Sequence, residues 1–141
     1  MIVPDTNLLV YATDQASRFH ERARVWLEEV LSGTESIGFA WNVLLGFLRI
    51  STRAVRRPLT AEQALGLVGL WLAQPNVVIL KPGPRHFELL SGLLLSVGTA
   101  GNLTSDAHLA AIALEHSAEV YSNDTDFGRF PGLRWRNPLA S

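Results

Sequence analysis

The chain of 141 residues contains no cysteine and a single lysine, Lys81. Without cysteine it can form neither a disulfide nor a thiolate metal site, which suits a reducing cytoplasm. The longest apolar stretches, 39–48 and 89–97, are too short or too interrupted to span a membrane. The N-terminus has no basic flank and carries Asp5 where a signal peptide needs apolar residues. We therefore expect a cytoplasmic protein with no membrane association.

Charge is also scarce. Charged residues make up 18% of the chain and the net charge is −1, so the bulk charge does not indicate nucleic-acid binding, and such binding would have to come from a local patch. Apolar residues make up 48% of the chain, which is enough to build the core of one domain. We expect a single domain over residues 1–141, with some apolar surface buried in a partner.

Apolar, β-branched runs alternate with amphipathic segments along the chain. Apolar residues recur at helical spacing in 17–31, and Thr60 with Gln63 makes a capping box before another helix. The expected strands are 1–5, 36–40, 76–80, 119–122 and an edge strand at 133–136, and the expected helices are 17–31, 42–52, 60–72, 84–97 and 104–116. This alternation predicts an α/β fold whose parallel sheet is covered on both faces.

Four of the five aspartates occur where an expected strand gives way to a turn or a helix. They are Asp5 after the first strand, Asp106 in the first turn of a helix, and Asp124 and Asp126 after the fourth strand. In parallel sheets functional groups gather at the carboxyl ends of the strands, and clustered carboxylates repel one another unless a cation holds them. Oxygen ligands without cysteine favour Mg²⁺, or Mn²⁺, over zinc, and such a site can serve phosphoryl transfer.

Each of these aspartates also has an ordinary structural explanation. Aspartate near a helix start is most often a cap, and the string SNDTDF that holds Asp124 and Asp126 is typical of a turn. A loop or cap role explains the fifth aspartate, Asp14, completely. For the other four taken together we favour the cation site.

The remaining polar and aromatic side chains carry less information. Arg49, Arg53, Arg56 and Arg57 would share one face if their helix extended that far. Arginine suits phosphate, but a solvated helix end explains these residues equally well. We assign the four histidines to surface or packing roles, because none has a partner at ligand spacing: His20, His86, His108 and His116. We expect three tryptophans in core-like positions: Trp26, Trp41 and Trp71.

Three motifs, in this order, are similar to those of the PIN domain: IVPDTNLLVYA at the start, SDAHLAAIALEH late in the chain and SNDTDFGRFPGL near its end. The resemblance is to the VapC-type toxins of bacterial toxin–antitoxin pairs, and FAWNVLLGFLRISTR resembles one VapC subgroup. It implies a three-layer α/β/α fold with a central parallel sheet, and a Mg²⁺-dependent endoribonuclease that cleaves RNA phosphodiesters with metal-activated water. It also implies a homodimer inhibited by a cognate VapB-type antitoxin, whose C-terminal segment covers the active site.

The same resemblance suggests roles for the acidic residues. Asp5 is similar to the family's first metal-binding aspartate, and Asp106 resembles the later one that shares the metal. Asp124 and Asp126 match the acidic pair that closes the pocket. We expect Asp5, Asp106 and Asp124 to hold the metal and Asp126 to support the site as a further catalytic residue. For the RNA backbone, we expect contacts from Arg49 or Arg53.

One position departs from the family pattern. Many PIN domains carry a glutamate on the helix after the second strand, and the matching position here is Gly46. A full acidic quartet and a second metal are therefore in doubt, although Asp126 could compensate or three carboxylates could suffice. The alternative is a catalytically weakened PIN-fold module that binds RNA or a partner. An aspartyl-phosphate hydrolase is disfavoured, because Asn7 stands where that chemistry uses a second carboxylate.

Overall fold

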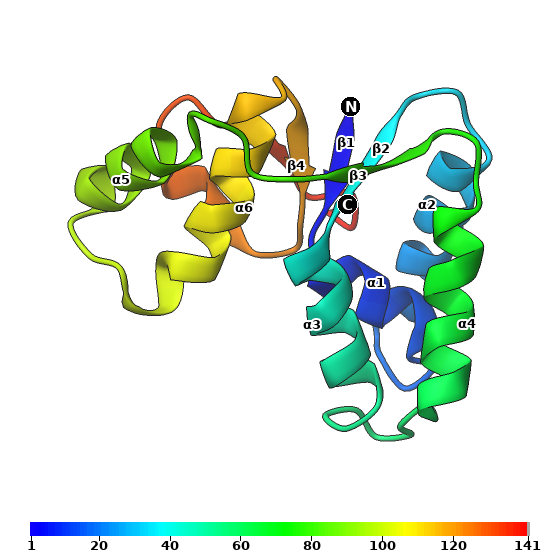
Figure 1. Ribbon diagram of the computed structural model, residues 1–141. Helices are drawn as coiled ribbons and strands as arrows, with labels where there is room; N and C mark the ends of the chain where they lie inside the picture. Colours follow the sequence, from blue (N-terminus) through cyan, green and yellow to red (C-terminus); the bar gives the residue numbers. More distant parts are fainter. Residues whose placement is uncertain (141) are drawn as a thin grey trace.

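The computed structural model describes residues 1–140 of the chain, and Figure 1 shows its elements. The strands are β1 (Ile2–Pro4), β2 (Ile37–Ala40), β3 (Val77–Leu80), β4 (Glu119–Tyr121) and β5 (Trp135–Arg136). The α-helices are α1 (Thr6–Thr13), α2 (His20–Leu31), α3 (Trp41–Ser51), α4 (Ala61–Leu72), α5 (His86–Val97) and α6 (Thr104–Glu115). Two 3₁₀ helices, η1 (Gly101–Leu103) and η2 (Thr125–Arg129), complete the order.

The five strands form one parallel sheet in the order β3-β2-β1-β4-β5. In the pairing of β1 with β4, Pro4 lies opposite Tyr121, and the backbone N–H of Asp5 donates to the Tyr121 carbonyl at 2.9 Å. The first and fourth strands are thus neighbours, and their carboxyl ends lie at the same edge of the sheet. Asp5 and the segment after Tyr121 leave the sheet side by side.

Helices cover both faces of this sheet. Helices α1 to α4 pack together on one side, and α5 and α6 lie on the other, with the sheet between them (Figure 1). The expected three-layer α/β/α fold is confirmed. No helix within residues 1–140 has the length and apolar character that a membrane crossing requires.

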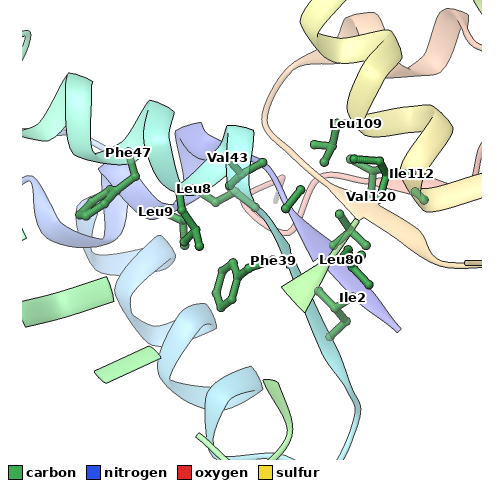
Figure 2. Packing of buried hydrophobic residues seen from close by; sticks show 14 of the residues in the cluster. Ile2, Leu8, Leu9, Phe39, Val43, Phe47, Leu80, Leu109, Ile112 and Val120 are labelled. Carbon is green, nitrogen blue, oxygen red and sulfur yellow. The ribbon is translucent and has the colours of Figure 1, made fainter. Parts of the chain in front are cut away.

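The core lies between the sheet and the helices on each side (Figure 2). Trp71 of α4 packs against Phe39 of β2 and Phe47 of α3, with ring centroids 6.2 and 4.8 Å away. On the other side of the sheet, Val120 of β4 is fully buried in the same core as the apolar residues of α6, such as Ile112. These contacts anchor β2 on one face of the sheet and β4 on the other, and β1 lies between these two strands.

One expectation from the sequence is wrong. Trp41 is 48% exposed rather than in the core, because it is the first residue of α3 and lies outside the packed stripe that Val43 and Phe47 form. Helix α3 ends at Ser51, close to the expected end, so the condition for a shared face of the four arginines, a helix that extends to Arg57, is not met.

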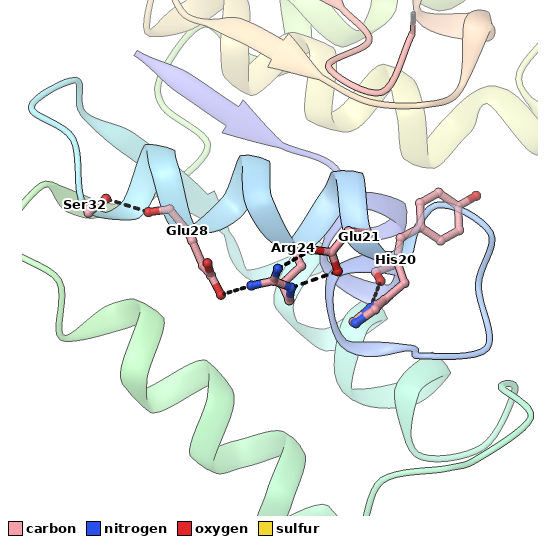
Figure 3. Close-up of polar contacts among 6 residues, drawn as sticks. His20, Glu21, Arg24, Glu28 and Ser32 are labelled. Atoms are coloured by element: carbon pink, nitrogen blue, oxygen red, sulfur yellow. Dashed lines mark hydrogen bonds and ion pairs between the residues drawn. The ribbon is translucent and has the colours of Figure 1, made fainter.

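Hydrogen bonds along α2 join side chains to one another and to the backbone of α1 and α2 (Figure 3). Arg24 bonds to Glu21 and, at 2.8 Å, to Glu28, so its charge is already neutralised. His20 Nδ1 lies 3.0 Å from the Tyr11 carbonyl, which links α2 to α1. In the connecting loop Asp14 accepts from the Ala16 N–H at 3.0 Å, which confirms its expected loop role.

Candidate metal centre

Asp5 lies at the junction of β1 and α1. It caps α1 with Oδ1, which accepts from the Thr6 N–H at 2.8 Å, while Oδ2 accepts from the Ser122 hydroxyl at 2.7 Å. The two carboxylate oxygens are therefore fixed by two donors, one just after β1 and the other just after β4. The cap interpretation of Asp5 is correct, and it is compatible with a ligand role because each oxygen retains a lone pair.

Ser122, directly after β4, connects the elements around the site. Its fully buried hydroxyl donates to Asp5 and accepts from the Asn7 side chain at 3.2 Å and from the Asp124 N–H at 2.9 Å. Asp124 in turn accepts from the Asp126 N–H at 2.9 Å and caps η2. This network sets the direction of the whole segment 122–126 relative to Asp5.

Asp106, Asp124 and Asp126 form the acidic group of the site. One carboxylate oxygen from each lies within 4.8 Å of those of the other two, and all three residues are partly buried. Asp106 enters from the first turn of α6, where the helix dipole favours an anion. Asp5 is not among the three, but its charge still acts on Asp106, and it is tied to Asp124 through Ser122.

Burial and mutual repulsion disfavour the charged forms of the carboxylates in this site. Burial raises the pKa of Asp106 to about 7, reinforced by the negative charges of Asp5, Asp124 and Asp126 and by a hydrogen bond to Asp124. The pKa of Asp5 is also raised, chiefly by burial, and the hydrogen bonds from Ser122 and Thr6 oppose that change. A cation between the carboxylates would relieve both effects. The donor set consists of oxygens only, which fits Mg²⁺ or Mn²⁺.

Gly46, at the position where the family often has an acid, is closed in by α1. A Cβ at this glycine would lie 2.9 Å from the Thr6 Oγ1. That hydroxyl donates to the Val43 carbonyl at 3.0 Å, so it is held in place. A side chain at this position would therefore require Thr6 to shift.

A cavity of about 320 Å³ opens beside the acidic group, between α1, α3 and the start of α6. Its wall includes Thr6 and Ser105, the chain neighbours of Asp5 and Asp106. Asn42 also lines the cavity, and its buried Oδ1 has no hydrogen-bond partner within residues 1–140. Arg49 also lines this cavity, whereas Arg53 does not. The structure thus places one of the two arginines expected at the RNA backbone next to the acidic site.

The histidines contain a pair that the sequence reading missed. His86 Nε2 and His108 Nδ1 lie 2.9 Å apart, so the expectation that neither has a partner is wrong. The pair forms because α5 and α6 pack together, which brings residues 22 positions apart into contact. Burial, and then the charge of His86, lowers the pKa of His108. No third metal-ligating side chain joins them within residues 1–140, so the packing role stands.

Comparisons with known proteins identify the family of the chain. The PIN domain family matches residues 2–133. The chain is 46% identical to Ribonuclease VapC37 of Mycobacterium tuberculosis over 99% of both chains, and 40% identical to Ribonuclease VapC43 of the same species over 99% of this chain and 96% of that protein.

Solved structures share the fold at lower identity. VapBC2 from Rickettsia felis, bound to a DNA fragment from its promoter, has a TM-score of 0.68 and 23% identity, covering 97% of this chain and 98% of that one. VapC20 of Mycobacterium tuberculosis, described as a sarcin-ricin loop cleaving toxin, has a TM-score of 0.69 and 18% identity, covering 95% and 99%. The chain therefore belongs to the PIN-domain family and, within it, to the VapC ribonucleases.

Proposed function

We propose that this chain is a Mg²⁺-dependent endoribonuclease, the toxin of a VapBC-type toxin–antitoxin pair. The observation that carries the proposal is the group formed by Asp106 of the first turn of α6 with Asp124 and Asp126 after β4, in which the pKa of Asp106 is raised to about 7. Three carboxylates this close repel one another, and the ion pair of Arg129 with Asp126 at 3.9 Å offsets that repulsion only in part, so the group is suited to a cation. Relatives that are 46% identical over nearly the whole length are ribonucleases, which supports RNA as the substrate.

In this proposal, Asp106 and Asp124 hold the ion, together with Asp5 or Asp126. A bound Mg²⁺ supplies an activated water and neutralises charge that develops on the phosphate. Ser122 keeps the Asp5 carboxylate directed by its hydrogen bond, and the Asp124 side chain is fixed by the Asp126 N–H. These hydrogen bonds orient the carboxylates before the substrate arrives, so little reorganisation is needed.

The cavity beside the acidic group would receive the RNA strand next to the scissile bond. Arg49 on its wall is exposed and can donate a two-pronged hydrogen bond to a phosphate. Asn42 offers a buried amide whose oxygen has no partner, which is suited to a hydroxyl or amino group of a nucleotide. Because its substrate is RNA, we place the activity in the cytoplasm.

We also propose a VapB-type antitoxin as partner and a homodimer as the assembly. Several solved structures of the same fold are VapBC complexes. Large apolar side chains are exposed on the helices available for such contacts, among them Leu70 of α4 at 62% and Leu95 of α5 at 81%. An isolated chain has little reason to expose so many of these side chains.

The test is cleavage of RNA by the purified chain with Mg²⁺, with EDTA, and with Mg²⁺ restored. We expect the variant Asp124→Asn/Asp126→Asn to lose cleavage, while Asp14→Asn, which removes a loop carboxylate outside the site, retains it. Cleavage that survives EDTA, or that survives in the double variant, would refute the metal mechanism. An absence of Mg²⁺-dependent product from the wild type would favour the weakened binding module. Sequencing the RNA ends produced after induced expression would identify the target.

A further inference from the structure

Within residues 1–140, the four arginines from Arg49 to Arg57 form no ion pair, although the chain is nearly neutral overall. The ion pairs found within residues 1–140 involve other cations, such as Arg24, which bonds to two glutamates on α2 (Figure 3). All four of the unpaired arginines are exposed. Within residues 1–140, positive charge thus gathers in this stretch without an ion-paired carboxylate to neutralise it.

The arginines extend from the acidic site toward the far end of α1. Arg49 lines the cavity beside the acidic group, together with the first residue of α1, Thr6. Beyond the end of α3 the backbone makes one more helical hydrogen bond, from the Ala54 N–H to the Ile50 carbonyl at 2.8 Å, so Arg53 follows Arg49 about one turn later.

Arg56 and Arg57 then line a second cavity, of about 240 Å³, with Gln15 and Ala16 just past the end of α1. The two cavities therefore lie at opposite ends of α1, which is eight residues long and spans about 12 Å. Helix α3 packs along α1 and carries Arg49, Arg53 follows just beyond its end, and the loop after α3 closes the lower end of this side in Figure 1.

The chemistry of the second cavity fits a phosphate chain better than a protein. It contains two arginine forks and the Gln15 amide, and its only apolar lining residue is Ala16. Arginine forks match phosphate oxygens, whereas a protein partner would need a pocket for a large apolar anchor. Asp14 is the chain neighbour of Gln15, and Glu62 is the carboxylate nearest to Arg57 in sequence. Neither makes an ion pair with Arg56 or Arg57.

We propose that Arg49, Arg53, Arg56 and Arg57 form a track that binds the phosphodiester backbone of the RNA substrate, leading from the acidic site to the cavity at Arg56 and Arg57. The proposal rests on the ribonuclease function and adds the part of the RNA beyond the scissile bond. It makes the enzyme depend on several nucleotides on one side of the cut. RNA that is too short to reach the second cavity loses the contacts of Arg56 and Arg57.

The test measures binding of single-stranded RNA by fluorescence anisotropy over a range of salt, in the Asp106→Asn background so that RNA is not cut. Arg56→Gln/Arg57→Gln is compared with Arg85→Gln/Arg134→Gln, which removes the same charge from exposed arginines outside both cavities. Each lost phosphate contact lowers the slope of log Kd against log salt by about 0.7, so the track variant should lose about 1.4. Between about 50 and 200 mM salt, wild-type affinity should then fall about sevenfold more than that of the track variant.

We expect the ratio of variant to wild-type Kd to increase with RNA length, and the control pair to stay close to wild type. Equal slopes for the track and control variants, or no length dependence, would overturn the proposal. So would a track variant that binds RNA normally but loses binding to a poly-glutamate peptide, which would assign the arginines to an acidic protein partner. Cleavage by the otherwise unmodified chain is measured separately: binding through the track without Mg²⁺-dependent cleavage refutes the nuclease and leaves the track standing.

Discussion

Replacement of Asp106 by asparagine should stabilise the metal-free protein near pH 8, although it removes a carboxylate from the proposed centre. In the folded chain the pKa of Asp106 is raised to about 7 from its ordinary value of 3.8. Below pH 3.8 the carboxyl of Asp106 is protonated in both the folded and the unfolded chain, so its full contribution to the free energy of unfolding is present. As the pH rises toward 7 the unfolded chain releases this proton while the folded chain retains it, and stability falls. Asparagine has no such proton to release.

The magnitude follows from the same difference in pKa. Each pKa unit corresponds to about 1.36 kcal/mol, so the interval from 3.8 to about 7 sets an upper limit of about 4 kcal/mol. Asp106 is only half-buried, and solvent screens part of the repulsion, so we expect a gain of about 1–2 kcal/mol for Asp106→Asn at pH 8. The gain should shrink as the pH is lowered and disappear below 3.8.

The assay is urea unfolding followed by far-UV circular dichroism, in EDTA, at one protein concentration and at several pH values. A gain of this size moves the midpoint by about 1 M urea. Asp14→Asn is the control for a loop carboxylate. With saturating Mg²⁺ the order should reverse, because the wild type gains up to about 2.7 kcal/mol at a hundredfold excess over Kd and the variant binds the ion poorly. A variant that is no more stable than wild type at pH 8, or whose gain in unfolding free energy is the same at every pH, would refute the reasoning.

Three further outcomes follow from the site. Asp5→Ala should abolish Mg²⁺-dependent cleavage with an unchanged far-UV spectrum; cleavage by the folded variant would contradict the role of Asp5. The Mg²⁺ concentration that gives half-maximal cleavage should rise as the pH falls below about 7, because protons compete with the ion at Asp106; a flat dependence would contradict this competition. Gly46→Ala should lower the free energy of unfolding by about 1–3 kcal/mol through its clash with Thr6, and Thr6→Ala should relieve part of the loss, so additive effects would argue against the clash.

Much of the fold could be predicted because its information is local. The apolar, β-branched runs of the strands and the capping box of Thr60 and Gln63 are short-range features, and the structure places β2, β3 and α4 within a residue of the expected bounds. The aspartates could be found for the same reason, since strand ends are visible in sequence. Their convergence required one further fact, the pairing of β1 with β4, which the sequence alone left as a condition.

The features that could not be predicted depend on contacts between distant segments. His86 and His108 meet only because α5 packs on α6, and neither position has a local pattern that shows it. Ser122 is the centre of the site's hydrogen bonds because three segments surround it, whereas in sequence it is a polar residue at a strand end. The exposure of Trp41 likewise depends on what lies opposite the start of α3 rather than on its apolar character.

Glycine at position 46 argues for one metal ion rather than for loss of activity. A carboxylate reaching the site from this point of α3 would have to displace Thr6, whose hydroxyl is held by the Val43 carbonyl. It would also add another negative charge near Asp106, whose pKa is already raised to about 7. The three carboxylates of Asp106, Asp124 and Asp126 lie close enough together to surround a single cation. We therefore expect calorimetric titration with Mg²⁺ or Mn²⁺ to give one ion per chain at pH 8; two ions per chain would mean that a second group of ligands, without position 46, completes the centre.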